Sequence, residues 1–118
     1  MSKSIIQKDY TECFVCGSKR NLEEHHVFQG SNRKNSEEDG LKVKLCYECH
    51  RGNEGAHNNI FLKRELHLIG QTAYEKKHSY ESFVKRYGKD FIETGIQEGY
   101  LWKENGCIRG KYKLRLSK

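Results

Sequence analysis

Apolar and polar residues alternate along residues 41–45, where three apolar side chains fall on one face and two lysines on the other. A period of two residues is typical of a β-strand with one buried face. Residues 22–28 have the composition of a second short strand, and the polar residues 29–39 between the two are expected to form a loop. The pattern therefore predicts a β-hairpin in the first half of the chain.

The pattern changes to the period of an α-helix over residues 59–77. Apolar positions recur there at the spacing of one helix face, with charged residues opposite. That face consists of Leu62, Leu66, Ile69 and Ala73. Asn58 or Asn59 is expected to cap this helix, because an asparagine side chain accepts hydrogen bonds from the first free backbone N–H groups.

The remaining segments are shorter. Ser79 is expected to cap a helix over residues 80–87, and Gly88 is expected to end it. Residues 109–115 alternate between basic and other residues and predict a strand with one basic face. Residues 89–106 show no regular period.

Composition limits the size of the core. A chain of 118 residues with 35% hydrophobic residues and a mean hydropathy of −0.95 predicts one domain, with or without a small extension, and a thin core. A metal ion that crosslinks such a domain is physically useful. Residues 1–11 are a polar lead-in without a signal-peptide pattern, and no apolar run is long enough to span a bilayer. We therefore expect a reducing, cytoplasmic compartment and no membrane partner.

The net charge of +6 is unevenly distributed. Residues 1–57 carry nine Lys or Arg and nine Asp or Glu, whereas residues 58–118 carry thirteen and seven. A basic half favours a polyanionic partner, most simply nucleic acid. On charge alone, an ordinary solvated basic surface is an equally good interpretation.

Two C-x-x-C motifs carry the strongest signal. Each motif places two sulfur atoms on one edge of a tetrahedron, and two motifs joined by a hairpin close a site for a structural Zn²⁺ ion. The motifs supply Cys13, Cys16, Cys46 and Cys49. The alternative is a set of free or redox-active thiols, which is the less common use of such pairs in a reducing compartment. Cys107 has no partner at this spacing and is expected to be a small buried apolar residue.

Four histidines lie beside these motifs: His25, His26, His50 and His57. The hairpin and the start of the long helix are expected to bring them into one small volume. Hydrolysis of a phosphodiester needs a divalent cation and a base with a pKa near neutrality. A histidine side chain can act as that base or as a ligand of the cation. Adjacent strand residues point to opposite faces, so His25 and His26 share a site only if the chain bends there. The alternative is that all four are polar residues packed around the zinc site.

The order of these motifs resembles that of the zinc-bearing HNH endonucleases. The resemblance covers about residues 10–60 and rests on Cys13-x-x-Cys16, His25-His26-Val27, Leu45-Cys46-x-x-Cys49-His50 and His57. It implies an α+β fold with a ββα-metal (His-Me finger) core and a four-cysteine zinc knuckle over residues 1–60, whose helix continues to about residue 77. Residues 78–118 would form a helical, basic extension packed on the core. This extension resembles that of short phage and prophage HNH proteins, some of which are similar to RecA-dependent recombination nucleases.

The resemblance implies a metal-dependent DNA endonuclease of phage or bacterial type that leaves 3′-hydroxyl and 5′-phosphate ends. It makes His26 the general base and His25 a metal ligand. His57 and His50 would complete the metal site, with Glu54 as a weaker candidate ligand. Nitrogen ligands favour Zn²⁺, Ni²⁺ or Mn²⁺ for this second cation, and Mg²⁺ stays an alternative.

The sequence departs from the family pattern at Gly40, which stands where the middle Asn of the HNH motif usually lies. That Asn braces a loop through hydrogen bonds to backbone, and Asn32 or Asn35 is expected to replace it. Outside the motifs, His67 and His78 are expected on helix surfaces. Two further expectations are that Glu23 and Glu24 are solvated and that Trp102 lies in the core.

Phosphate contacts are expected from exposed cations, which bind nucleic acid without reading sequence. These are Arg33, Lys34, Lys85, Arg86, Lys89, Arg109, Lys111, Lys113 and Arg115. The implied partners are single- or double-stranded DNA and a recombination or phage packaging protein. Two rival functions are a non-catalytic, zinc-stabilised nucleic-acid-binding module and a zinc-crosslinked protein-interaction domain.

Overall fold

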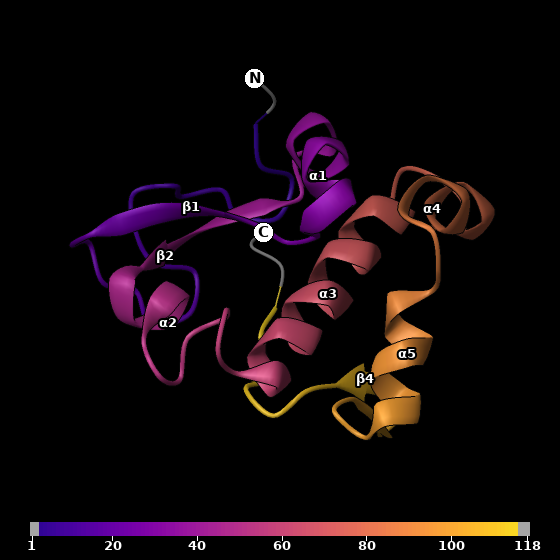
Figure 1. Cartoon of the computed structure of the whole chain (residues 1–118). Coiled ribbons are helices and arrows are strands. Elements are labelled where there is room, and N and C mark those ends of the chain that lie inside the picture. Colours follow the sequence, from indigo (N-terminus) through magenta and orange to yellow (C-terminus); the bar gives the residue numbers. More distant parts are fainter. Residues whose placement is uncertain (1–2, 116–118) are drawn as a thin grey trace.

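A long helix runs through the middle of the molecule, with a β-hairpin on one side of it (Figure 1). The computed structural model describes residues 3–115 and has the predicted α+β class. The strands are β1 (Leu22–His26), β2 (Lys42–Cys46), β3 (Trp102–Glu104) and β4 (Cys107–Arg109). The helices are η1 (Gly30–Asn32), α1 (Arg33–Asp39), α2 (Tyr47–Arg51), α3 (Ile60–Glu75), α4 (Tyr80–Tyr87) and α5 (Phe91–Glu98).

The predicted hairpin is present: β1 and β2 pair antiparallel, with His25 opposite Val43 and His26 opposite Lys42. Val43 and Leu45 are fully buried, as the alternating pattern predicts. The first strand is shorter than the predicted range of 22–28, because after His26 the chain leaves the strand and buries Val27 and Phe28.

The free edge of β2 is occupied by the N-terminal segment, residues 3–12. Ser4 Oγ donates to the carbonyl oxygen of Lys42 at 2.6 Å, and the Ile5 N–H donates to the carbonyl oxygen of Gly40 at 2.9 Å. Ile6 is 1% exposed. The described part of the predicted polar lead-in is therefore an ordered cover for the hairpin, and its partners Gly40, Lys42 and Lys44 lie far along the chain.

The connection between the two strands was predicted as a loop over residues 29–39, and this was wrong, because it contains η1 and α1. Ser36, which is completely buried, donates its hydroxyl to Phe28 O at 2.8 Å and accepts from Phe28 N at 3.1 Å. Gly40 adopts a left-handed φ of 74° that ends α1. Weak helix formers such as Asn and Ser give little local signal here, and the helix depends on this tertiary contact.

Helix α3 follows the prediction closely. Asn59 caps it by accepting hydrogen bonds from the N–H groups of Phe61 and Leu62. Gly70 faces the turn after β1, where a Cβ atom would lie 2.8 Å from Val27 Cγ1 and 3.1 Å from Phe28 Cε2. A glycine at this position therefore lets the hairpin lie directly against α3.

The predicted helix over 80–87 is confirmed, with Ser79 as its N-cap and left-handed Gly88 after its last residue. Helix α5 has no counterpart in the prediction, although Asp90 caps it through a hydrogen bond from Glu93 N. Both helices lie beside α3 on the side away from the hairpin (Figure 1). Phe83 and Tyr87 of α4 belong to the same buried cluster as the hairpin residues.

The strand predicted over residues 109–115 was wrong. Only Arg109 lies in a strand, at the end of β4, and Lys113 has a left-handed φ of 53°. The carboxylate of Glu65, itself 1% exposed, instead accepts hydrogen bonds from the backbone N–H groups of Tyr112 and Leu114. A buried acceptor on α3 therefore determines the path of this segment.

Three side-chain predictions were also wrong. Cys107 is exposed on the short two-stranded β3–β4 hairpin, and Trp102 on the same hairpin is 36% exposed. His67 is buried on α3, because its ring stacks on Phe28 and lies edge-on to Phe91. Within residues 3–115, no helix combines the length and the apolar character needed to cross a bilayer.

Candidate metal centres

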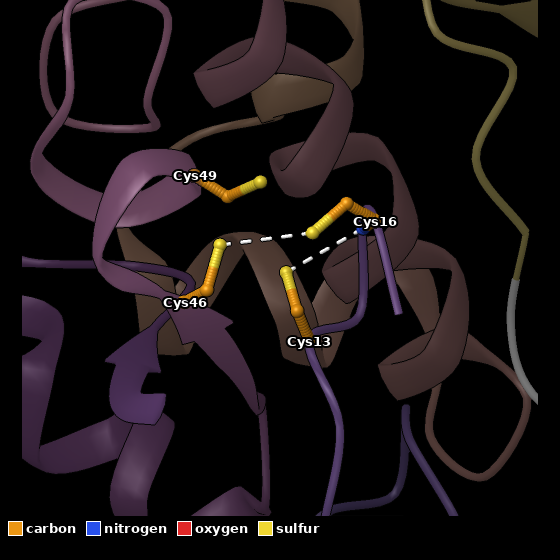
Figure 2. A group of neighbouring side chains, drawn as sticks. All are labelled: Cys13, Cys16, Cys46 and Cys49. Atoms are coloured by element: carbon orange, nitrogen blue, oxygen red, sulfur yellow. Dashed lines mark hydrogen bonds between the residues drawn. The ribbon is translucent and has the colours of Figure 1, made fainter. Parts of the chain in front are cut away.

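The two C-x-x-C motifs meet as predicted. All four sulfur atoms lie within 4.8 Å of one another, and Cys16 Sγ lies 3.6 Å from Cys46 Sγ. Figure 2 shows the four side chains pointing toward a common centre. Cys13 and Cys46 are buried, while Cys16 is exposed. Four convergent sulfur donors fit a metal ion such as Zn²⁺, which is tetrahedral in closed structural sites.

Local backbone geometry places these sulfur atoms. The Gly17 N–H donates to Cys13 O at 2.9 Å, and Gly17 has the left-handed φ of 80° that this tight turn requires. In the second motif, Cys46 ends β2 and is the N-cap of α2, so that Cys49 lies one helical turn later. The hairpin register then brings the first motif and the second motif together.

The acidity of the thiols agrees with a cation-binding role. Burial raises the pKa of Cys13, but hydrogen bonds from the backbone N–H groups of Cys16, Cys46 and Val15 outweigh it and lower that pKa to about 7. Burial and the neighbouring sulfur atoms raise the pKa of Cys49. Several thiolates can therefore coexist in this volume only when a cation offsets their charge.

A second candidate metal centre consists of His25, His50 and His57, which come from β1, α2 and the loop before α3. One ring nitrogen of each lies within 4.8 Å of the other two. His50 Nε2 is 2.9 Å from His57 Nε2, and the His25 ring is 5.1 Å from the His50 ring between centroids. The structure thus brings together the three histidines proposed as ligands of the second cation.

Glu23 was expected in solvent and instead supports this centre. Its Oε1 accepts hydrogen bonds from His50 Nδ1 at 2.7 Å and from Arg51 Nε at 2.9 Å. These two bonds lower the pKa of Glu23. In a neutral His50 ring, a proton held at Nδ1 by Glu23 leaves the lone pair on Nε2, as a metal-binding imidazole needs. The sequence could have indicated that Glu23 faces this centre, since Glu23 and His25 are two residues apart and lie on the same face of a strand.

His25 and His57 are suited to bind as neutral ligands. Burial, followed by the nearby His50 and His57 rings, lowers the pKa of His25 to about 3. Burial, followed by the nearby His50 ring, also lowers the pKa of His57. His57 is nevertheless exposed, so the centre is open to solvent on one side. Three protein ligands with an open side are typical of catalytic metal sites, which keep a position for water or substrate.

His26, predicted as the general base, lies on the opposite face of β1. Its Nε2 is 2.8 Å from Glu37 Oε1, and the second oxygen of Glu37 is 2.7 Å from the ammonium group of Lys42. Lys42 is also 3.5 Å from Glu24, so Glu24 is not simply solvated. Lys42 and His26, in that order, lower the pKa of Glu37 to about 2. Although Glu24, His26 and Glu37 form a third ligand-like group, the buried Lys42 ammonium already supplies its positive charge.

Gly40 cannot be replaced by Asn in this fold, because a Cβ atom there would collide with the backbone oxygen of Lys3. Asn32 and Asn35 were the expected substitutes, and both contact the backbone of α4. Their side chains donate to Tyr87 O at 2.9 Å and to Arg86 O at 3.1 Å. These bonds join η1 and α1 to α4, at a distance in sequence that no local pattern reveals.

Glu54 is not part of the three-histidine centre and interacts with the Asn59 side chain instead.

The cations proposed for nucleic-acid binding differ in whether they are free to contact phosphate. Arg86 is held by Glu38 and Asp39, and Lys113 lies 3.6 Å from Glu104. The ammonium groups of Lys89 and Lys111 lie over aromatic rings, while Arg109 is half-buried. Among the described residues, the exposed members that form no such ion pair or ring contact are Arg33, Lys34, Lys85 and Arg115.

Comparison of the chain with protein-family models, with curated proteins and with solved structures found no match. The interpretation of the two centres therefore depends on their own geometry and on the motif resemblance.

Proposed function

We propose that the protein is a metal-dependent nuclease of the HNH type that hydrolyses phosphodiester bonds in DNA. The observation that supports this best is the three-histidine centre, in which His25, His50 and His57 converge from three separate elements. A merely structural cluster of polar side chains would not need one ring fixed by Glu23 or one ring left open to solvent.

The roles of the side chains follow from their contacts. His25, His50 and His57 would hold a divalent cation, and Glu23 would orient His50 for that purpose. Such a cation acts as a Lewis acid that stabilises the charge developing on the scissile phosphate. The four-cysteine centre would hold a structural Zn²⁺ that fixes β2 and α2 relative to the turn formed by the first motif. Its ligands would be Cys13, Cys16, Cys46 and Cys49.

The general base is assigned from the resemblance, which points to His26. Glu37 holds Nε2 of His26, so a proton from water would be taken at Nδ1. His26 is the last residue of β1, where the chain leaves the strand. Its position on the far face from His25 nevertheless favours a second candidate function, a zinc-stabilised nucleic-acid-binding module without catalysis.

A plasmid-nicking assay with Mg²⁺, Mn²⁺, Ni²⁺ and Zn²⁺ tests the proposal. We expect wild-type protein and H78A to nick DNA, because His78 is exposed and far in sequence from the centre, and we expect H57A to be inactive. Binding without cleavage in all four metals would favour the module. Undiminished cleavage by H26A, with metal binding retained, would rule out His26 as the base and leave the three-histidine centre to be judged by H57A.

A further inference from the structure

The N-terminal segment presents its side chains in fixed positions. Gln7, which is 5% exposed, accepts a hydrogen bond from Lys44 N at 2.8 Å and donates to the carbonyl oxygens of Asp9 and Glu12. Together with the contacts of Ser4 to the edge of β2, these bonds fix the segment at both ends. A ligand that binds here therefore meets a surface that is already ordered.

A cavity of about 640 Å³ opens between this segment and the hairpin. Lys3 and Lys8 line it from the segment, and Glu24 and Lys42 line it from the hairpin. Glu24 already accepts a hydrogen bond from Tyr10 and faces Lys42, so its charge is partly compensated. The lining as a whole carries more positive than negative groups, and it suits an anionic ligand.

A second cavity, of about 300 Å³, adjoins the first and lies between the segment and the end of α3. Lys8 lines both cavities, and Lys76 and Lys77 line the second. Lys3, Lys8, Lys76 and Lys77 are all exposed, and within residues 3–115 none of the four forms an ion pair. Free ammonium groups around two adjoining openings fit an extended polyanion better than a single small anion.

We propose that Lys3, Lys8, Lys76 and Lys77 form a binding surface for the phosphate backbone of nucleic acid. This inference rests on the proposed function and concerns phosphates away from the cleaved bond, because neither cavity is lined by His25, His50 or His57. The surface differs from the cations chosen from sequence, of which Arg86 and Lys113 are engaged by acidic residues. It also borders the face of β1 that carries His26, because Glu24 lines the larger cavity and lies 3.9 Å from His26 Nε2.

The test compares two double variants that change charge equally. K3E/K8E alters the proposed surface, whereas K19E/K103E alters two exposed lysines that line neither cavity. Binding of zinc-loaded protein to a fluorescent DNA duplex is measured by anisotropy at several salt concentrations, without added catalytic metal. We expect K3E/K8E to weaken binding at least tenfold and to reduce the slope of log K against log salt by about 0.9 for each phosphate that the variant no longer neutralises. K19E/K103E is expected to change binding less than threefold.

Equal losses in both variants, or wild-type affinity in K3E/K8E, would overturn the inference. A milder variant, K3Q/K8Q, guards against misfolding and is expected to bind with an affinity between those of wild-type protein and K3E/K8E, with an unchanged thermal midpoint. The outcomes also separate this inference from the proposed function. If wild-type protein nicks DNA and K3E/K8E does so with the same KM, only the binding surface is wrong; if wild-type protein neither binds nor nicks DNA, both ideas fail.

Discussion

Replacing Glu23 with Gln should weaken metal binding at the three-histidine centre while leaving the four-cysteine centre intact. The substitution keeps the side-chain shape but removes the negative charge that fixes the proton on Nδ1 of His50, 2.7 Å away. Loss of a carboxylate that orients a histidine ligand typically costs 10- to 100-fold in metal affinity. Glu23 is partly exposed, and Arg51 shares the same oxygen, so water can replace part of the interaction. We therefore expect a loss of about tenfold, at the low end of that range.

Titration calorimetry of zinc-loaded protein with Ni²⁺ measures this affinity directly. E48Q is the matched control, because it removes the same charge from an exposed position on α2, the helix that carries His50. The reasoning would be refuted if E23Q bound Ni²⁺ as tightly as wild-type protein, or if E48Q lost as much affinity as E23Q. A loss of bound zinc in E23Q would show instead that Glu23 supports the fold.

Three further predictions concern stability. Removing the structural metal with a chelator, or replacing Cys49 with Ser, should lower the thermal midpoint measured by circular dichroism, because metal binding at a closed site contributes directly to folding; an unchanged midpoint would contradict a structural role. Glu65→Ala should destabilise the protein by about 3 kcal/mol in urea unfolding. The reason is that Tyr112 and Leu114 each lose a hydrogen bond to a buried carboxylate, worth about 1.5–3 kcal/mol. A loss below about 1 kcal/mol would show that water replaces the carboxylate as acceptor. Burial lowers the pKa of His67 to about 3, so stability should be fully present above the ordinary pKa near 6.5 and should fall as pH drops from 6.5 toward 3, while the unfolded chain alone takes up the proton. His67→Phe should flatten that pH profile, and a profile identical to wild type would refute the assignment.

Elements with strong local signals could be predicted from the sequence. Asn59, Ser79 and Gly88 act on backbone groups within a few residues, so the bounds of α3 and α4 followed from them. The hairpin followed from alternation, and the four-cysteine centre from spacing. In each case the residues that carry the information are close to the structure that they determine.

Other features depend on partners that are distant in the chain. Helix α1 needs Ser36 to meet Phe28, and the path of the last described residues depends on Glu65 of α3. The same holds for the site: the pairing of Glu23 with His50 and of Glu37 with His26 becomes visible only when β1, α1 and α2 are in place. The alternating pattern of residues 109–115 was misleading because a buried acceptor, rather than a neighbouring strand, satisfies the N–H groups of Tyr112 and Leu114.

The cover that residues 3–12 form on β2 has a consequence for the behaviour of the protein in solution. A two-stranded ribbon with a bare edge offers unpaired peptide groups to any other chain and tends to associate. Here Ser4, Ile5 and Gln7 use up those groups. Proteolytic trimming of this segment should therefore produce self-association through the ribbon before it produces any loss of helix content.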